Sequence, residues 1–194
     1  MKKQLAPILA WHFTRDDCRM RYEDNRIVRA GHVYRAKGPL VLCENGLHEN
    51  GLHGSKRIVD ALCYAPGAHV WRVELRGERV IGDDKIVARE RKVLWGLDAT
   101  KILHEFACRC AEDALLLIKD PDPRSIEAIR VKRLWVTGKA TAGELAAAGV
   151  ARDATRDAAG AARDAAEAKQ NKRLTAMIIA AHRQRQATPK ERRP

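Results

Sequence analysis

The chain has 194 residues and a formal net charge of +12 at pH 7, with 45% hydrophobic and 32% charged residues. This composition is typical of a folded protein with one compact domain and an appendage, or with two small domains, and it excludes general disorder. No stretch approaches the ~20 apolar residues of a membrane-spanning helix, so we expect no membrane association. Five cysteines without a repeating spacing favour reduced thiols and a cytoplasmic location.

The first 97 residues are predicted to be rich in β-strands. Residues 7–13 form a short apolar run near the N-terminus. No signal-peptide cleavage site follows this run, so we interpret it as a first strand and not as a signal peptide. Residues 38–43 form a second strand-like run. Residues 69–77 alternate between apolar and polar side chains, which is typical of a strand with one buried face. Residues 85–95 are predicted to be a further strand or pair of strands.

One helix and two turns punctuate this β-rich region. Gly77-Glu78 and Gly82-Asp83-Asp84 have the composition of turns. Ser55 is predicted to cap a helix that Pro66-Gly67 ends. The helix would present one apolar face, formed by Ile58, Val59, Leu62 and Cys63.

The second half is predicted to be mainly helical. A helix capped by Asp98 is expected to run to Ile118, with apolar residues at close to helical spacing. The Pro- and Asp-rich residues 120–125 end it. Residues 120–138 are then interpreted as a linker and a return segment that reaches the core near Trp135.

The last third of the chain is rich in alanine. Thr141 and Glu144 have the spacing of a capping box that opens a helix. The motif ARDAT recurs 11 residues later as ARDAA, an offset that keeps equivalent side chains on one helix face. Residues 139–186 are therefore predicted to be an Ala-rich helical extension able to self-associate, and residues 187–194 a basic tail. We expect an α+β fold, with a β-rich core domain over residues 1–119 that contains the embedded helix, followed by helices and a long Ala-rich C-terminal helix.

The positive charge concentrates at the C-terminal end. Residues 169–194 hold eight Lys and Arg against one Glu, which is over half of the net charge. We predict an anionic partner for this segment, either nucleic acid or an acidic protein face, with a solubilising tail as the alternative. The candidate partner-binding residues are Lys172, Arg173, Arg183, Arg185, Lys190, Arg192 and Arg193.

The residues on their own predict neither a catalytic site nor a metal site. The motif ENGLH occurs twice in succession, and a zinc site there would use Cys43, His48, His53 and Cys63. That spacing matches no structural zinc pattern, so a duplicated surface loop is favoured and no metal is expected. The chain has no GxxxxGK[ST] loop and no nucleophile-elbow signature. Aromatic residues are only 5% of the chain, so nucleic-acid binding would be to phosphates and would depend steeply on salt.

Nearly the whole chain resembles a family of uncharacterised proteins. The residues that carry the resemblance are LAWHF, GPLVLCENGLH, GLHGSKRIVDALCYAPGAHVWRVELRGE, GDDKIVARERKVLW and FACRCAEDALLL. This family occurs mainly in bacteriophages and prophages, and combines a conserved domain of unknown function with Ala-rich repeats and an ending like QNKRLTAMI. The resemblance implies a phage-encoded accessory or virion-associated protein. The family has a single GLH before its helix, whereas this chain has two, and His53 is a better match than His48.

A more distant resemblance is to the core of ADP-ribosyltransferases, through VYR at residues 33–35, the GLHGS junction and VELRGE. In that family an aromatic residue or Arg on the first strand and a Ser on the second hold NAD, and a Glu on a late strand stabilises the reacting ribose cation. The resemblance implies the candidate site residues Tyr34, Arg35, His53, Ser55 and Glu90, with NAD as the cofactor. Lys92 stands where the catalytic Glu belongs, and a cation does not stabilise an oxocarbenium-like transition state.

Three functions stay open. The favoured one is a non-catalytic phage accessory protein in the host cytoplasm that occupies nucleic acid or a host nucleic-acid-handling complex, such as a defence system. The second is a divergent ADP-ribosyltransferase. The third is a minor virion component whose Ala-rich helices assemble into a bundle. No cofactor is expected for the first or the third.

Overall fold

The computed structural model describes residues 6–21, 24–42, 50–146 and 163–187. Contacts within the chain divide it into two compact units, one made of residues 1–99 with 179–194 and the other of residues 100–178. The first unit contains all of the described strands, and the second contains helices. The predicted α+β class, with a β-rich N-terminal part followed by helices, is therefore confirmed.

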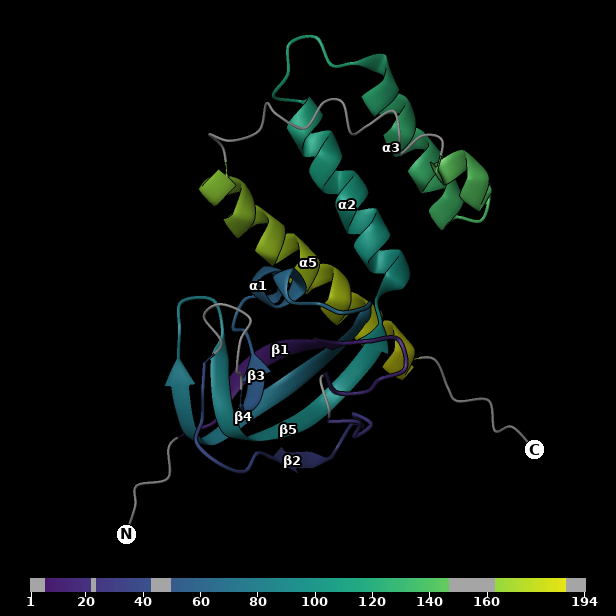
Figure 1. Ribbon diagram of the computed structural model, residues 1–194. Helices are drawn as coiled ribbons and strands as arrows, with labels where there is room; N and C mark the ends of the chain where they lie inside the picture. Colours follow the sequence, from purple (N-terminus) through teal and green to yellow (C-terminus); the bar gives the residue numbers. More distant parts are fainter. Residues whose placement is uncertain (1–5, 22–23, 43–49, 147–162, 188–194) are drawn as a thin grey trace, which may run out of the picture. The chain divides into compact units, whose positions relative to one another are not determined.

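Five antiparallel strands form the sheet of the first unit. They are β1 Ile8–Thr14, β2 Val33–Arg35, β3 Leu52–Gly54, β4 His69–Ile81 and β5 Ile86–Asp98. Four of them follow the order β1-β4-β5-β2, and β3 also pairs with β5 (Figure 1). The long strand β5 is thus the element to which three other strands are attached.

The strand pairings close into a ring. β1 pairs with β4, β4 with β5, and β5 with β3. Just past β3, the amide of Ser55 donates to the carbonyl of Trp11 on β1 at 2.9 Å, and the amide of Trp11 donates back at 2.8 Å. Gly54 suits this seam because a Cβ there would lie 3.1 Å from the Cβ of Ala10 and 3.2 Å from a backbone oxygen. The bridge therefore joins the two ends of the β1-β4-β5-β3 series.

The centre of β4 supplies much of the core. Trp71, Val73 and Leu75 are buried, as their alternation with Arg72 and Glu74 predicts. The indole N–H of Trp71 is satisfied by the hydroxyl of Thr14, at 2.9 Å. The other buried members of this core cluster are Ala10, Met20, Val28, Tyr34, Leu52, Ile86, Ala88 and Val93.

Gly77 does not end a strand, contrary to the prediction. β4 continues to Ile81, with a bulge between Arg76 and Arg79 at which Gly77 has a φ of 72°. Glycine adopts this conformation without a steric penalty, so the extra residue is absorbed while the pairing resumes. The second predicted turn is confirmed, because the amide of Gly82 donates to the carbonyl of Lys85 at 2.9 Å and joins β4 to β5.

Residues 38–43, predicted as a strand, do not form one in the described part of the segment. Val41 makes only an isolated bridge to Asn50. The physical reason lies in the first two residues of the segment, Gly38 and Pro39. Gly38 has a φ of 74°, and Pro39 has no amide N–H to give to a ladder.

The embedded helix is confirmed, but its start differs. α1 spans Ile58–Cys63, and its N-cap is Arg57 instead of Ser55. The bridge to β1 holds the backbone of Ser55 in an extended conformation, so the helix begins later. Ile58 and Ala61 are the buried side chains, whereas Cys63, which was predicted for the same face, is exposed.

The second unit contains α2, Thr100–Leu115, and α3, Pro123–Val136. β5 extends through Asp98, so this residue lies at a strand end where a helix cap was predicted. α3 occupies most of the segment that was interpreted as a linker and return. Asp122 caps it by accepting a hydrogen bond from the amide of Arg124 at 2.8 Å, and Pro123 follows at the first helical position, where its lost donor is not needed.

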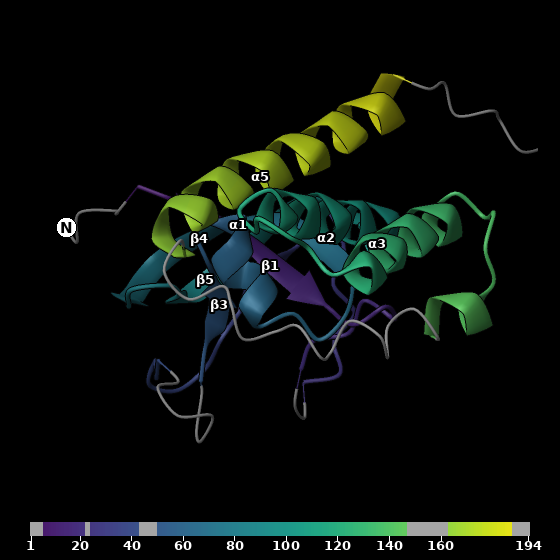
Figure 2. The ribbon, with the colours of Figure 1, turned by 90° about the horizontal axis from the view of Figure 1, so that it is seen from above.

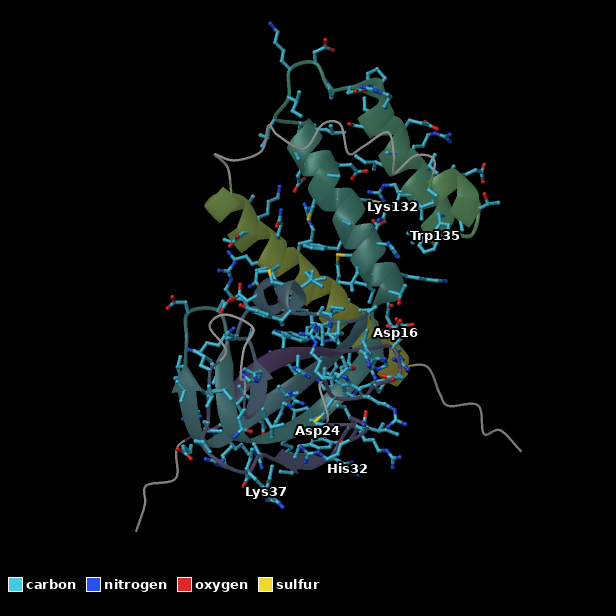
Figure 3. All side chains as sticks on the ribbon, viewed as in Figure 1. Asp16, Asp24, His32, Lys37, Lys132 and Trp135 are labelled. Carbon is cyan, nitrogen blue, oxygen red and sulfur yellow. The ribbon has the colours of Figure 1, made fainter. Side chains whose placement is uncertain are left out.

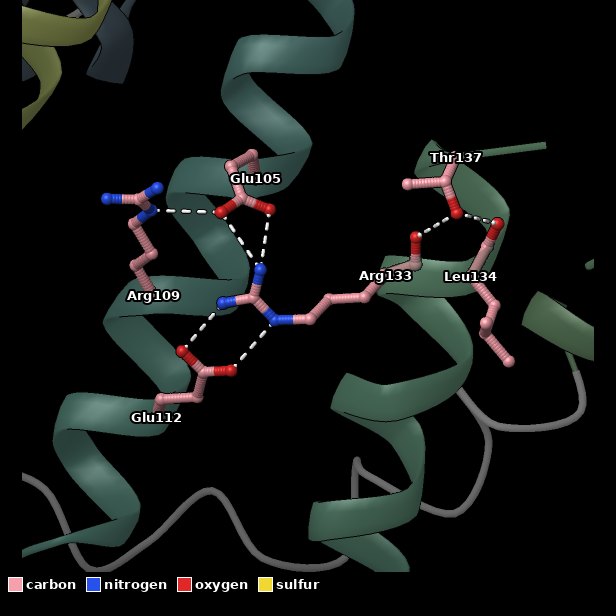
Figure 4. A network of polar contacts seen from close by, with 6 residues as sticks. All are labelled: Glu105, Arg109, Glu112, Arg133, Leu134 and Thr137. Carbon is pink, nitrogen blue, oxygen red and sulfur yellow. Dashed lines mark hydrogen bonds and ion pairs between the residues drawn. The ribbon is translucent and has the colours of Figure 1, made fainter. Parts of the chain in front are cut away.

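Arg133 of α3 links two carboxylates of α2 (Figure 4). Its Nε and Nη2 donate to the two oxygens of Glu112 at 2.8 and 2.7 Å, and its Nη1 donates to both oxygens of Glu105 at 2.9 and 2.8 Å. Burial raises the pKa of Glu105, but hydrogen bonds from Arg109 and Arg133 lower it by more. The net pKa of Glu105 is therefore below its usual value. Beside this network, the ring of His104 lies edge-on to Trp135, which Figure 3 labels, with centroids 4.6 Å apart.

The predicted capping box is present at the start of the Ala-rich region. The amide of Glu144 donates to the hydroxyl of Thr141 at 3.2 Å, and the amide of Thr141 donates to the carboxylate of Glu144 at 2.7 Å. Most of the ARDAT repeat lies outside the described residues. The predicted long C-terminal helix is α5, Arg163–Ala187, which is uninterrupted (Figure 2). Its residues Leu174 and Ile178 are fully buried.

Candidate functional site

The predicted partner-binding cations fall into three groups. Lys172, Arg183 and Arg185 are exposed on α5. Arg173 is different, because its guanidinium lies 2.9 Å from the carboxylate of Asp113 on α2. The remaining three, Lys190, Arg192 and Arg193, lie outside the described residues.

Asp113 is shared by two cations of α5. Lys169 approaches the same carboxylate oxygen as Arg173, at 3.0 Å. Hydrogen bonds from Arg173 and Lys169 lower the pKa of Asp113, so the carboxylate is charged at neutral pH. Arg173 therefore forms an ion pair with Asp113 within the same unit. The sequence alone does not distinguish Arg173 from the other cations of α5.

The C-terminal part of α5 has no acidic residue to offset its charge. After Glu167, the helix carries five Lys and Arg and no Asp or Glu up to its end at Ala187. Lys172 and Arg183 are 11 residues apart, which places them about 20° apart around the helix axis. Neither of them, nor Arg185, forms an ion pair with a carboxylate in the described part of the chain. These cations are free to meet phosphate or carboxylate groups from outside.

An aromatic stack holds this end of α5 within the first unit. The imidazole of His182 lies flat on the indole of Trp95, with centroids 4.0 Å apart. Trp95 meets Trp11 edge-on at 5.7 Å, and the guanidinium of Arg72 covers the ring of Trp11 at 4.4 Å. Burial lowers the pKa of Arg72, and the indole face provides a partial substitute for its lost hydration. His182 precedes Arg183 directly, so the stack fixes where the exposed cations are presented.

The candidates implied by the ADP-ribosyltransferase resemblance lie on β5 and on or just past the strands β2 and β3 that pair with it. Tyr34 is 7% exposed, and its hydroxyl donates to the carbonyl of Ile27 at 2.8 Å and accepts from the amide of Arg29 at 2.9 Å. Arg35 donates to Glu90 at 3.0 Å across the β2–β5 pair. The Tyr34 hydroxyl thus holds a loop, and the Arg35 and Glu90 side chains hold each other.

His53 and Ser55 lie on and beside β3. Ser55 is 2% exposed at the seam of the ring. The carbonyl of His53 accepts a hydrogen bond from Arg91 on β5. These residues therefore have structural roles, and NAD binding by any of the five stays a prediction.

Sequence reasoning missed two ionisable groups inside the sheet. Arg91 is 2% exposed on β5, and His12 is partly buried on β1. The pKa of His12 is held well below its usual value, first by burial and then by the nearby charges of Arg91, His53 and Arg21. The available signal was the alternation within β5, where Arg91 has the same parity as the buried Val93.

Several other features of the described residues bear on function. No group of three or more His, Cys, Asp or Glu side chains there is arranged to hold a metal ion, and Cys43 and His48 lie outside this part of the chain. The four cysteines that can be placed are free. No helix in the placed segments has the length and apolar character needed to cross a membrane.

Comparison with known proteins gives one match. Neither the curated proteins nor the solved structures contain a significant match to the chain. Residues 8–105 match a family defined by a domain of unknown function, DUF7666. This match extends over half of the chain and runs from β1 into α2. The protein therefore belongs to the DUF7666 family.

Proposed function

We propose that the protein is a non-catalytic accessory protein of a phage or prophage, and that it acts in the host cytoplasm. It binds nucleic acid, or the nucleic-acid groove of a host protein complex, through the basic end of α5 and the tail that follows. The observation that carries this proposal is the exposure of Lys172, Arg183 and Arg185 without a carboxylate partner among the described residues. The family resemblance described above supports the phage origin.

The charge pattern favours phosphate contacts over base contacts. Trp95 and Trp11 are already stacked with His182 and Arg72, so these aromatic faces are not offered to nucleotide bases. Each cation that neutralises a phosphate contributes about −0.9 to the slope of log affinity against log salt on duplex DNA. Binding is therefore independent of base sequence and weakens steeply as salt is added.

The test measures the affinity of the full chain for a short labelled DNA duplex and for a single-stranded RNA over a range of salt concentrations. The informative variant replaces Lys172, Arg183 and Arg185 by Gln. We expect this variant to bind more weakly than the wild type at low salt, with a salt slope that is shallower by about 2 to 3.

The matched control removes three positive charges elsewhere, through Arg15→Gln, Arg124→Gln and Arg130→Gln. Each of these exposed cations already has a carboxylate partner, namely Asp17, Asp122 and Glu127. The control should keep most of the affinity and slope. Equal losses in both variants would show only a dependence on net charge and would contradict a binding surface on α5.

The protein-complex version is tested by affinity purification from nuclease-treated bacterial lysate with the same two variants. Truncation after residue 168 is unsuitable, because it removes the fully buried Leu174 and Ile178 and disturbs the fold. Truncation after Ala187 removes only the basic tail and keeps α5 complete. A host complex that is recovered by the control but lost with the α5 variant or the tail supports the proposal.

A further inference from the structure

The guanidinium of Arg91 is buried without a counter-ion among the described residues. Its Nη1 donates to the carbonyl of His53 at 2.8 Å, and its Nε has no hydrogen-bond partner in the part of the chain that the structure describes. The side chain forms no ion pair with a carboxylate in the placed parts of the chain. A buried charge of this kind is strongly unfavourable unless an opposite charge accompanies it.

The carboxylate that acts on Arg91, Asp24, is already paired with another cation. Asp24, labelled in Figure 3, receives the Nε of Arg26 at 2.8 Å and its Nη2 at 2.6 Å. The backbone amide of Arg26 also donates to Asp24, at 3.2 Å. Asp24 therefore neutralises Arg26 and leaves the charge of Arg91 in excess.

Other nitrogen groups gather around the same position. The charges of Arg91, His53 and Arg21 all act on His12, and no carboxylate is among the groups that influence it. His12 comes from β1, His53 from β3 and Arg91 from β5, and the charges of His53 and Arg91 both act on His12. The fold thus builds a region of positive potential in its interior.

Arg91 keeps its proton, and therefore its positive charge, at neutral pH. Burial lowers its pKa to about 10, still well above neutral pH, so almost every molecule carries the cation. Tyr34, which the register places opposite Arg91, does not supply an acceptor, because its hydroxyl donates its proton to Ile27 and accepts from Arg29. Among the described residues, no group supplies the anionic partner that this arrangement calls for.

We propose that the buried guanidinium of Arg91 on β5 binds a small oxyanion, a phosphate or carboxylate group, through its unpaired Nε edge. A guanidinium edge matches the two oxygens of such a group. Because Arg91 is 2% exposed, the group that reaches it is compact, either a free ion or the end of a larger molecule. This site is separate from the cations of α5 and does not depend on the function proposed for them.

The test follows the thermal unfolding midpoint, Tm, of the full chain at constant ionic strength while chloride is replaced by inorganic phosphate or by acetate. A ligand that binds the native state raises Tm in a saturable way. A nucleoside monophosphate in a third series distinguishes a free ion from the terminal phosphate of a larger ligand. We expect a saturable rise with at least one of these anions.

Two variants decide whether the effect belongs to Arg91. Arg91→Met should remove the anion-dependent rise while keeping or raising Tm in chloride, since an apolar side chain no longer buries a charge. The double variant Arg183→Gln/Arg185→Gln should respond like the wild type. A purely structural Arg91 would instead give a lower Tm for Arg91→Met in every salt and no response of the wild type to any anion.

A measurement on the wild type covers the case in which Arg91→Met fails to fold. The Nε–H of a buried arginine exchanges slowly with water, so its resonance can be followed by nitrogen-15 NMR during the phosphate and acetate titrations. A saturable shift of a protected Nε–H signal supports the site. The absence of any Tm rise and of any such shift overturns the proposal, as does an equal Tm rise in Arg91→Met.

Discussion

The imidazole of His182 and the indole of Trp95 are stacked, with centroids 4.0 Å apart and planes 8° from parallel. Trp95 in turn contacts Trp11 edge-on, with an interplanar angle of 81°. This contact connects the C-terminal end of α5 to β5 and β1 within one unit. The position of the exposed Arg183 therefore depends on a pair of rings that are 87 residues apart in the sequence.

His182→Ala is expected to lower the free energy of unfolding by about 1 kcal/mol, because it removes an aromatic pair. His182→Phe keeps a flat ring and should recover most of this loss. Urea unfolding of both variants provides the measurement, with Gln186→Ala as the control at an exposed position of the same helix. Equal effects of His182→Ala and Gln186→Ala would show that the stack contributes nothing to stability.

Arg133→Gln is expected to lower the free energy of unfolding by about 1–2 kcal/mol, because one side chain holds both Glu105 and Glu112. The matched control is Arg130→Gln on the same helix. Among the described residues, the ion-pair partner of Arg130 is Glu127, three residues away, and both side chains are more than half exposed. Its loss should cost much less than the loss of Arg133, because water and salt screen an exposed pair.

Salt separates these two variants further. Because the Arg133 network is only partly exposed, its contribution should persist in part at high salt, whereas the Arg130 pair should be fully screened. If Arg133→Gln were as stable as the wild type at every salt concentration, the network seen in Figure 4 would not stabilise the pair of helices α2 and α3.

The strands were predictable where their pattern is local. The alternation over residues 69–77 identifies β4 because each side chain reports its own face of the sheet. The bridge between Trp11 and Ser55 was not predictable, since it joins positions 44 residues apart and uses only backbone groups. The Asp-Pro sequence before α3 is suitable both for a loop and for a helix start, and only the structure distinguishes the two.

For the candidate sites too, the sequence predicted what depends on local pattern and not what depends on contacts distant in the chain. The sequence located the excess of positive charge, but it could not separate Arg173 from Arg183. The carboxylate that occupies Arg173 is Asp113, 60 residues earlier in the chain. Arg91 lies in a run of charged residues that looks like a solvated strand face, and its burial follows from the pairing of β5 with strands on both sides.

Gly96→Ala is expected to destabilise the protein by about 3 kcal/mol or more, because overpacking of a buried site forces neighbours to move. A Cβ at position 96 would lie 2.2 Å from a ring carbon of Trp71, which is buried and bonded to Thr14. Gly143→Ala is the control, since its nearest neighbour is 3.9 Å away and a helical Ala is favoured over Gly. A mild effect of Gly96→Ala in thermal unfolding would contradict the close packing of β4 on β5.

Stability is expected to fall as the pH is lowered below about 6.5, the ordinary pKa of His. Burial, then Arg91, His53 and Arg21, hold the pKa of His12 well below that value in the folded state. The unfolded chain therefore takes up a proton in this range that the folded chain does not, and linkage shifts the equilibrium toward unfolding.

The measurement is urea unfolding at a series of pH values for the wild type, His12→Gln and His32→Gln. Burial lowers the pKa of His69, which Asp98 partly opposes, and burial together with Lys132 lowers that of His104, so these residues add to the slope. His12→Gln should make the slope shallower, and His32→Gln, at an exposed position, is the control for the loss of one imidazole. A slope that is unchanged in His12→Gln would show that His12 takes up its proton in both states.

Arg173→Gln and Arg183→Gln remove the same charge from the same helix, yet the structure gives them opposite effects. Arg173 is 21% exposed and paired with Asp113, so its loss should cost about 0.2–1 kcal/mol of stability and leave nucleic-acid affinity almost unchanged. Arg183 is exposed, so its loss should leave stability unchanged and make the salt slope of binding shallower by about 1. Urea unfolding and salt-dependent anisotropy on both variants give the two readouts. Equal losses of affinity would mean that binding follows the total charge of α5, and the arrangement of its cations would then have no part in recognising the partner.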